Sequence, residues 1–429
     1  MPTKQQSNHY VPQFIQRRFG EKINVYDLKQ ATLLMQKRPD KVFCTYGLYE
    51  NELEKLLSKH AESKVANLLF GKIIDAEDKI VLSRNEIALL KKFFVIEQLR
   101  TPDAIEYIAK EREDFRGQSS ECLLECGYFE NQTSALSNED YLSRTLRNLL
   151  EYEGSSADDL LEWLQKPTTT LVAQKWLRIF NSCYIAFWDS KKSGEDFLIT
   201  DEGMACEQDP SALPPFGLSA TEHLKLGFLA SVRDNPCLSK TQIIQAAKLA
   251  YNRAGIRANF YLFSLTATRT IALIDPFFRT YDSEDQWQSL FHLPPPDFWP
   301  SAFLDKGVAR KNKVVCDGPE NQYIYPVHDM QLEDVIYCNT LLLDRINNLL
   351  GFGESQKIIR SIATYLQIKN PRKDYQELKK ELEKNGYSIP ESQKYKDMAH
   401  GFATRPFLEI SKGLEYIEYV QRSLQKAGK

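Results

Sequence analysis

Four residues of this sequence have side chains suited to the hydrolysis of a phosphate ester: His9, Glu62, Arg100 and Asp201. An imidazole titrates near neutral pH and can activate water. Two carboxylates can hold a hard cation such as Mg²⁺ or Mn²⁺, and a guanidinium can balance the charge that grows on a phosphate. If the four side chains converge, they predict a nuclease or phosphodiesterase site with the metal held by Glu62 and Asp201. A reaction without metal, in which His9 shuttles a proton, also stays open.

Each of the four residues also has an ordinary structural interpretation. His9 could bond the backbone where a strand meets a helix, and Asp201 could cap a turn. Glu62 could mark the solvent edge of an apolar helix face, and Arg100 could meet the carbonyl groups that end a helix. The sequence therefore leaves two hypotheses. One is a hydrolase acting on nucleic acid or nucleotides, and the other is a non-catalytic binding protein whose motif residues are structural.

The N-terminal elements decide how His9 is presented. Pro12 suits the first position of a helix and favours an extended residue before it, so residues 9–11 are expected to form a short strand. Residues 23–38 alternate in character on both sides of a polar centre, which predicts a β-hairpin packed by the first helix. We therefore expect His9 at a junction between a strand and a helix.

Two long helical segments follow. Apolar residues recur at helical spacing through residues 52–70, and Glu54 and Glu62 share a face because eight residues make little more than two turns. A second helix begins at the capping-box pattern of residues 83–86 and ends before Pro102. The two helices are expected to pack together.

The middle of the chain combines helices with short strands. Helices are expected within residues 103–152, 167–182 and 239–256. Strand-like runs at 183–189 and 197–201 flank a polar turn, which predicts a β-hairpin that ends on Asp201. A further strand is expected at residues 259–264.

A chain of 429 residues exceeds the length at which single cores tend to divide, roughly 250 to 300 residues, so two domains are expected. Residues 1–270 are expected to form an α+β domain, mainly helical with a small antiparallel sheet. Residues 271–429 are expected to hold an aromatic and proline-rich region at 275–326 and a C-terminal helical module at 329–366 and 374–387.

Composition and missing motifs narrow the function. With 55 Lys and Arg against 58 Asp and Glu, the formal charge of -3 provides no global field that attracts nucleic acid. The phosphate-loop, dinucleotide-binding, His-Glu-x-x-His and Gly-x-Ser-x-Gly patterns are missing, which disfavours ATP-driven motors, Rossmann oxidoreductases, zinc proteases and typical α/β-hydrolases. The sequence has neither a secretory apolar core at its start nor a long apolar run, so we expect a cytoplasmic location without a membrane partner. The eight scattered cysteines predict reduced, mostly buried thiols.

Several short motifs of this sequence occur in an order that resembles the motif order of DUF4238, a bacterial family of unknown function. These motifs are residues 9–14, 17–19, 62–63, 98–102, 197–201, 252–253 and 258–261. The resemblance covers about residues 7–265. It implies that the polar motif residues form the site, with Tyr10 and Gln98 contacting the substrate. The fourth motif departs from the family's usual Thr-Ser-Asp-Asn-Pro, because Asp201 is followed here by Glu202 and Gly203, which shortens the polar turn.

Overall fold

The structure is a computed structural model that describes residues 7–207 with short gaps, residues 259–275 and 322–353, and isolated positions between 357 and 384. The gaps are 31, 121–122, 124–127, 130, 154–161 and 183. The helix expected at 239–256, most of the aromatic region at 275–326 and most of the segment at 374–387 lie outside the described residues.

Helices make up most of the described N-terminal half. They are α1 (Gln13–Gln16), η1 (Pro39–Lys41), α2 (Asn51–Leu57), η2 (Ser58–Glu62), α3 (Ser63–Leu68), η3 (Leu69–Ile73), α4 (Arg84–Gln98), α5 (Ala104–Arg116), α7 (Asn138–Glu151), α9 (Leu171–Ser182) and, further along the chain, α14 (Leu332–Arg345). The segments η2 and η3 are π-helical turns that continue α2 and α3 into one long rod. Among the described helices, none has the length and apolar character needed to cross a bilayer.

The strands form three sheets. In bonding order, the first contains β5 (Lys79–Ser83), β11 (Gln322–Asp329), β6 (Tyr184–Asp189), β10 (Arg269–Asp275), β9 (Asn259–Ser264) and β8 (Met204–Glu207). The second contains β3 (Thr32–Lys37), β2 (Ile23–Asp27), β12 (Leu349–Phe352) and β7 (Ile199–Thr200), and the third pairs β1 (Ser7–His9) with β4 (Cys44–Tyr46). Within the described part, β11 and β6 run parallel and the other paired strands run antiparallel.

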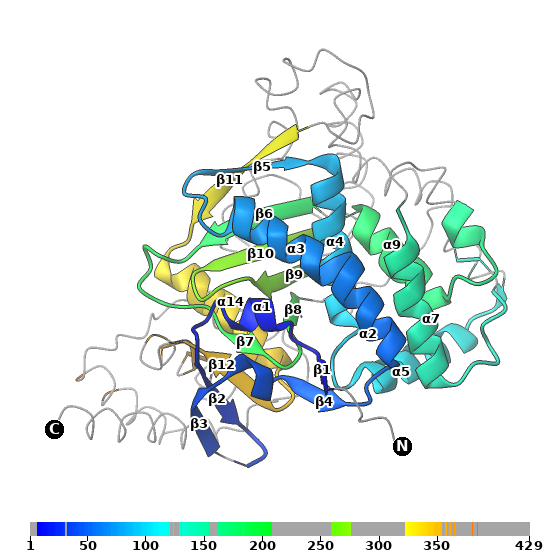
Figure 1. The fold of residues 1–429 in the computed structure, drawn as a ribbon, viewed down its shortest axis with the longest axis horizontal. Helices are drawn as coiled ribbons and strands as arrows, with labels where there is room; N and C mark the ends of the chain where they lie inside the picture. Colours follow the sequence, from blue (N-terminus) through cyan, green and yellow to red (C-terminus); the bar gives the residue numbers. More distant parts are fainter. Residues whose placement is uncertain are drawn as a thin grey trace.

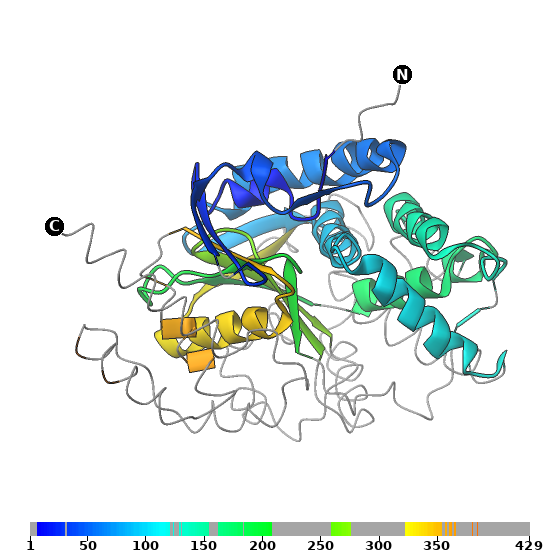
Figure 2. The same cartoon turned by 90° about the horizontal axis from the view of Figure 1, so that it is seen from below.

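The sheets lie between two helical layers. The long rod from α2 to η3 and the helix α4 lie on one side of the six-stranded sheet, and α14 lies on the other (Figure 1, Figure 2). Helices α5, α7 and α9 pack together beside this sandwich. Aromatic rings join the layers: Phe93 and Phe94 of α4 contact Phe263 of β9 with ring centroids 5.9 and 4.8 Å apart. One apolar core therefore connects the N-terminal helices to the large sheet.

The expected α+β class with small antiparallel sheets is confirmed. Strands β2 and β3 form the predicted hairpin, and β9 occupies the expected residues 259–264. The capping box that starts α4 is complete, because the Ser83 hydroxyl accepts from the Glu86 N–H at 3.3 Å and the Glu86 carboxylate accepts from the Ser83 N–H at 2.7 Å. These features depend on neighbours in the sequence.

Three expected elements differ from the structure. The hairpin predicted at 183–201 is wrong, because β6 pairs with β10 and β11 whereas β7 pairs with β12 in another sheet. The strand expected at residues 9–11 lies two residues earlier, and Pro12 precedes the first helix instead of beginning it. The helical segment expected at 329–366 is interrupted by β12. In each case a long-range partner overrides the local pattern.

The sheets continue across the boundary expected near residue 270. Strand β10 itself spans that position, β11 pairs with β5 and β6, and β12 pairs with β2 and β7. Residues 322–353 thus belong to the same sheets as the first 207 residues. The division into domains at 1–270 and 271–429 stays a prediction.

Candidate functional site

Arg100 is the centre of a polar cluster at the end of α4. Its Nε donates to the Tyr49 hydroxyl at 3.0 Å, and one terminal nitrogen donates to Glu62 at 2.6 Å and Glu97 at 2.7 Å. The other terminal nitrogen donates to the backbone carbonyl of His9 at 2.8 Å. We call Arg100 with Tyr49, Glu54, Glu62 and Glu97 the Arg100 cluster. Arg100 is 0% exposed, so acceptors of this chain enclose its charge completely.

Two of the carboxylates in the Arg100 cluster come from the long helical rod. Glu54 lies on α2 with a carboxylate oxygen 3.9 Å from the guanidinium, and Glu62 ends η2. Eight residues overshoot two α-helical turns by about 80°. The extra residue of a π-helical turn removes most of that offset. The shared face predicted for Glu54 and Glu62 is confirmed, because both carboxylates reach the same guanidinium.

The Arg100 cluster also holds the N-terminal segment in place. The Asn8 amide donates to Glu54 at 3.4 Å and accepts from the Leu48 N–H at 3.1 Å. Asn8 is fully buried, and its neighbour His9 offers its carbonyl to Arg100. The residues of β1 are thereby bonded to the rod and to the end of α4, which are distant in sequence.

Burial dominates the charge balance in the Arg100 cluster. Burial raises the pKa of Glu97, and repulsion from Glu62 acts in the same direction, whereas Arg100 opposes both. For Arg100 burial favours the neutral form, but Glu97, Tyr49 and Glu62 outweigh it and raise the pKa of the guanidinium. Glu97 is 2% exposed, so its carboxyl group is shielded from solvent.

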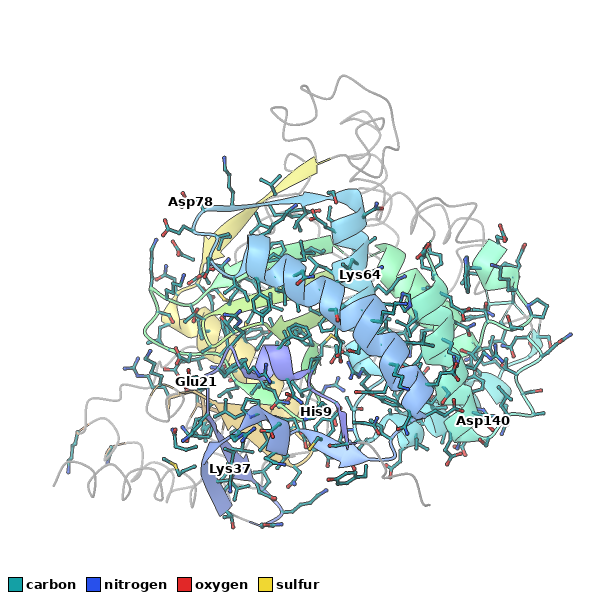
Figure 3. All side chains as sticks on the ribbon, viewed as in Figure 1. His9, Glu21, Lys37, Lys64, Asp78 and Asp140 are labelled. Carbon is teal, nitrogen blue, oxygen red and sulfur yellow. The ribbon has the colours of Figure 1, made fainter. Side chains whose placement is uncertain are left out.

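His9 lies beside the short helix α1 and is partly exposed (Figure 3). Burial lowers the pKa of its imidazole, while the Glu62 carboxylate raises it less strongly. The Gln13 amide lies 3.3 Å from one ring nitrogen and 3.5 Å from the other. The imidazole is therefore neutral near pH 7 and can accept a proton. Of the four predicted catalytic residues, the structure brings together His9, Glu62 and Arg100.

Asp201 is engaged in a different interaction. One carboxylate oxygen accepts the N–H of Asn347 at 3.0 Å, and the other accepts those of Asn348 at 2.6 Å and Leu349 at 2.9 Å. Asp201 is 2% exposed, and burial raises its pKa to about 6 against the opposing effect of these hydrogen bonds. Its carboxylate thus fixes the turn between α14 and β12, which is distant in sequence, instead of forming the local Asx cap that the structural interpretation expected.

The two residues predicted to contact a substrate have different surroundings. The Tyr10 ring is buried and packs edge-on against Phe43 with centroids 6.2 Å apart. Burial, followed by the charge of Asp201, raises the pKa of the Tyr10 phenol. Gln98 is half-buried at the last position of α4, and its side chain makes no hydrogen bond within the part of the chain that the structure describes. Contact of either residue with a substrate stays a prediction.

The predicted metal ligands do not fit a cation. Glu62 gives an oxygen to Arg100 at 2.6 Å, and both Asp201 oxygens accept backbone N–H groups. A cation would compete with these donors for the carboxylate oxygens, and the positive guanidinium at Glu62 would repel it. No grouping of three or more potential ligands of the His, Cys, Asp or Glu type occurs among the described residues. We therefore assign no metal to this site.

Some members of the Arg100 cluster were not predicted. Glu97 and Arg100 are three residues apart, which is ion-pair spacing on a helix, so this pair was accessible to sequence reasoning. Tyr49, and Asn8 which bonds the cluster from β1, carry no comparable signal, because their partners Arg100 and Glu54 lie 51 and 46 residues away.

Residues 7–227 match the family described as "Protein of unknown function (DUF4238)". No curated protein and no solved structure matches the chain.

Proposed function

We propose, from the premise that the chain belongs to the DUF4238 family, that it is a bacterial cytoplasmic binding protein whose motif residues are structural. The family's description states no function, so the proposal depends on the arrangement of the motif residues themselves. They are the residues that connect the N-terminal strand, the helical rod and the end of α4.

The enclosure of Arg100 carries this proposal. A guanidinium that stabilises a developing phosphate charge must present N–H groups to the substrate. Arg100 is 0% exposed and makes four hydrogen bonds to this chain. Release of the guanidinium would leave the buried Glu97 and the half-buried Glu62 without their cation, which is strongly unfavourable. This supports a structural role for Arg100.

His9 supports a second candidate, a nuclease-like hydrolase of nucleic acid or nucleotides. Its imidazole is partly exposed, and burial lowers its pKa, so it can act as a general base near neutral pH. Glu62, which raises the pKa of His9 by its charge, would stabilise the imidazolium after proton transfer. In this candidate Arg100 is a positioning residue that holds Glu62.

An activity panel distinguishes the two candidates. The purified full chain is incubated with RNA, single-stranded DNA, double-stranded DNA and nucleotides, with and without Mg²⁺ or Mn²⁺. The variants are His9→Ala and, as a matched control, His60→Ala, which removes an exposed histidine of η2. The binding proposal expects no turnover in any sample. Turnover by the wild type and His60→Ala that disappears in His9→Ala overturns it in favour of the hydrolase.

A further inference from the structure

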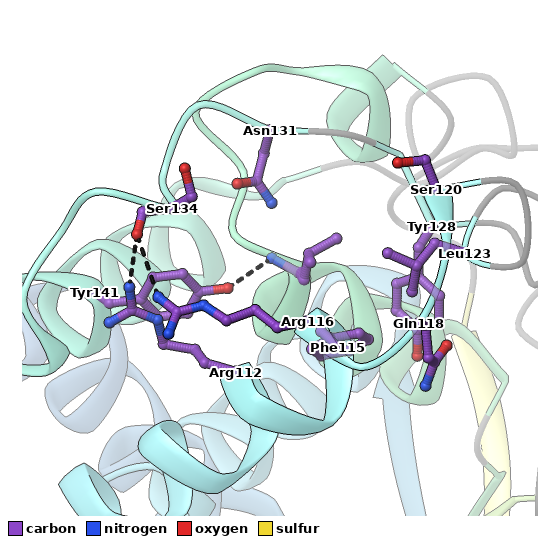
Figure 4. A pocket seen from close by; sticks show the side chains of 11 residues that line it. Arg112, Phe115, Arg116, Gln118, Ser120, Leu123, Tyr128, Asn131, Ser134 and Tyr141 are labelled. Carbon is purple, nitrogen blue, oxygen red and sulfur yellow. Dashed lines mark hydrogen bonds between the residues drawn. The ribbon is translucent and has the colours of Figure 1, made fainter.

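A second region suited to a ligand lies at the far end of α5. A cavity of about 470 Å³ opens between the last turns of α5, the segment that follows it and the start of α7 (Figure 4). Its volume lies within the range of small-molecule sites, roughly 300 to 1,000 Å³. The helix α5 begins near Arg100 and extends for about 18 Å to the cavity. The cavity is thus separate from the Arg100 cluster.

Two arginines line the cavity, and no carboxylate among the described residues forms an ion pair with either of them. Arg112 donates to the Asn138 side-chain oxygen at 2.6 Å and to the carbonyls of Ser134 and Leu136 at 2.9 and 2.8 Å. Arg116, one turn further along α5 and exposed, makes a weak contact of 3.5 Å to the Ser134 carbonyl. These acceptors are neutral, and neither arginine forms an ion pair within the described residues.

The guanidinium groups of Arg112 and Arg116 are close enough to repel each other at the cavity. Burial lowers the pKa of Arg112, and repulsion from the Arg116 guanidinium lowers it further. The Arg112 guanidinium stacks on the Tyr141 ring, 4.6 Å from its centroid, which fixes its plane beside the cavity. An anion placed between Arg112 and Arg116 would relieve their repulsion and use their remaining donors.

Asn131 supplies an independent sign of a missing partner. Its side-chain oxygen accepts the Thr133 N–H at 3.0 Å and also bonds the Thr133 hydroxyl. Because a backbone N–H requires an acceptor, this contact fixes which end of the amide is the nitrogen. That nitrogen, Nδ2, is buried and has no hydrogen-bond partner within the described structure, although Asn131 lines the cavity. A buried donor left unpaired costs about 1–3 kcal/mol, which an acceptor on a ligand would recover.

The opposite wall of the cavity is aromatic and apolar. Phe115 and Tyr128 meet edge-to-face with centroids 4.9 Å apart, and Leu123 and Leu171 also line the space. Such a wall suits a planar ring and offers little to a small inorganic ion. The cavity therefore combines a cationic end, a neutral donor and an aromatic surface.

We propose that this cavity binds a nucleoside monophosphate, with the phosphate at Arg112 and Arg116 and the base against Phe115 and Tyr128. The Asn131 amide donates to the bound nucleotide from the side. This inference deepens the binding function proposed above, because it names the class of ligand, and it rests on that function.

Isothermal titration of the full chain with AMP, GMP, CMP and UMP tests the site, with adenosine and inorganic phosphate as single-feature probes. The variant Arg116→Gln removes an exposed charge, and Arg144→Gln makes the same change on an exposed arginine of α7 outside the cavity. The variant Asn131→Asp keeps the oxygen that Thr133 requires and replaces the unpaired donor by an anionic oxygen.

The expected result is saturable binding of at least one nucleotide, at least tenfold tighter than adenosine or phosphate. Arg116→Gln and Asn131→Asp should each weaken it at least tenfold with unchanged circular dichroism, and Arg144→Gln should leave it unchanged. Absence of nucleotide binding, equal binding of phosphate alone, or equal loss in Arg144→Gln overturns the inference. The activity panel with His9→Ala tests the non-catalytic function, whereas the titration tests the nucleotide site at α5. A failure of one proposal can therefore be told apart from a failure of the other.

Discussion

Arginine occurs in two contrasting settings in this protein. Arg100 is enclosed, shares its hydrogen bonds with two carboxylates, a phenol and a carbonyl, and has a third carboxylate 3.9 Å away. Arg112 and Arg116 bond only neutral oxygens within the described residues and border a cavity. The charge of Arg100 is neutralised and connects elements of the fold, whereas the charges of Arg112 and Arg116 have no carboxylate partner in the described part of the chain, which is why we propose a ligand there. The most conspicuous polar motif of a sequence can therefore be architectural.

The largest effect is expected at Arg100. Arg100→Gln removes a fully buried cation from the buried Glu97 and the half-buried Glu62, so the free energy of unfolding should fall by about 3–5 kcal/mol. Denaturant unfolding measures this change. As the matched control, Arg116→Gln alters an exposed side chain and should change stability by less than about 0.5 kcal/mol. Equal effects of the two substitutions would remove the distinction between enclosed and available arginines.

The contrast extends to carboxylates, since Asp201 is bound by backbone N–H groups instead of a cation. Asp201→Asn places an amide nitrogen against one or more of the three donors at Asn347, Asn348 and Leu349. The free energy of unfolding should fall by about 2–3 kcal/mol because a buried N–H loses its acceptor. Denaturant unfolding measures the loss. A fully stable variant that had lost catalytic turnover would instead support Asp201 as a catalytic residue.

A smaller, pH-dependent effect is expected at Glu202. Burial and the neighbouring Asp201 raise its pKa to about 8, whereas an unfolded glutamate has a pKa of about 4.3. Between about pH 4.3 and pH 8, the Glu202 carboxyl group is protonated in the folded state and ionised in the unfolded state. The contribution of Glu202 to the free energy of unfolding therefore declines as pH rises through this range. Glu202→Gln removes the decline, so the variant should gain about 1–3 kcal/mol relative to the wild type between pH 5 and pH 8.

Unfolding curves at several pH values test this prediction at Glu202. Glu52→Gln serves as the control, because the same substitution is made at a side chain that is 76% exposed. A constant difference between Glu202→Gln and the wild type from pH 5 to pH 8 would contradict the expected proton uptake.

Local sequence signals predicted a large part of the fold. The hairpin β2–β3, the capping box at Ser83 and the strand β9 depend on alternation and capping within a few residues. The wrongly predicted hairpin at 183–201 has the same local signals, but the partners of β6 and β7 come from residues 269–352. Periodicity indicates that a strand forms and does not identify its partner.

The candidate site was predictable to a similar extent. The motif order grouped His9, Glu62 and Arg100 correctly, because these residues meet around one guanidinium. Their enclosure was not predictable, since burial depends on packing among distant elements. The cavity at α5 had no sequence signal, because an arginine pair one turn apart is ordinary on a helix surface, and its lack of carboxylate partners among the described residues depends on the fold.

The position of β11 has a consequence for synthesis of the chain. This strand, at Gln322–Asp329, lies between β5 and β6, which are made more than 130 residues earlier. Until the ribosome has released β11, the facing edges of β5 and β6 expose backbone groups that can pair with other nascent chains. A fragment ending just after β10, at Asp275, would keep those open edges permanently, so we expect it to aggregate through them.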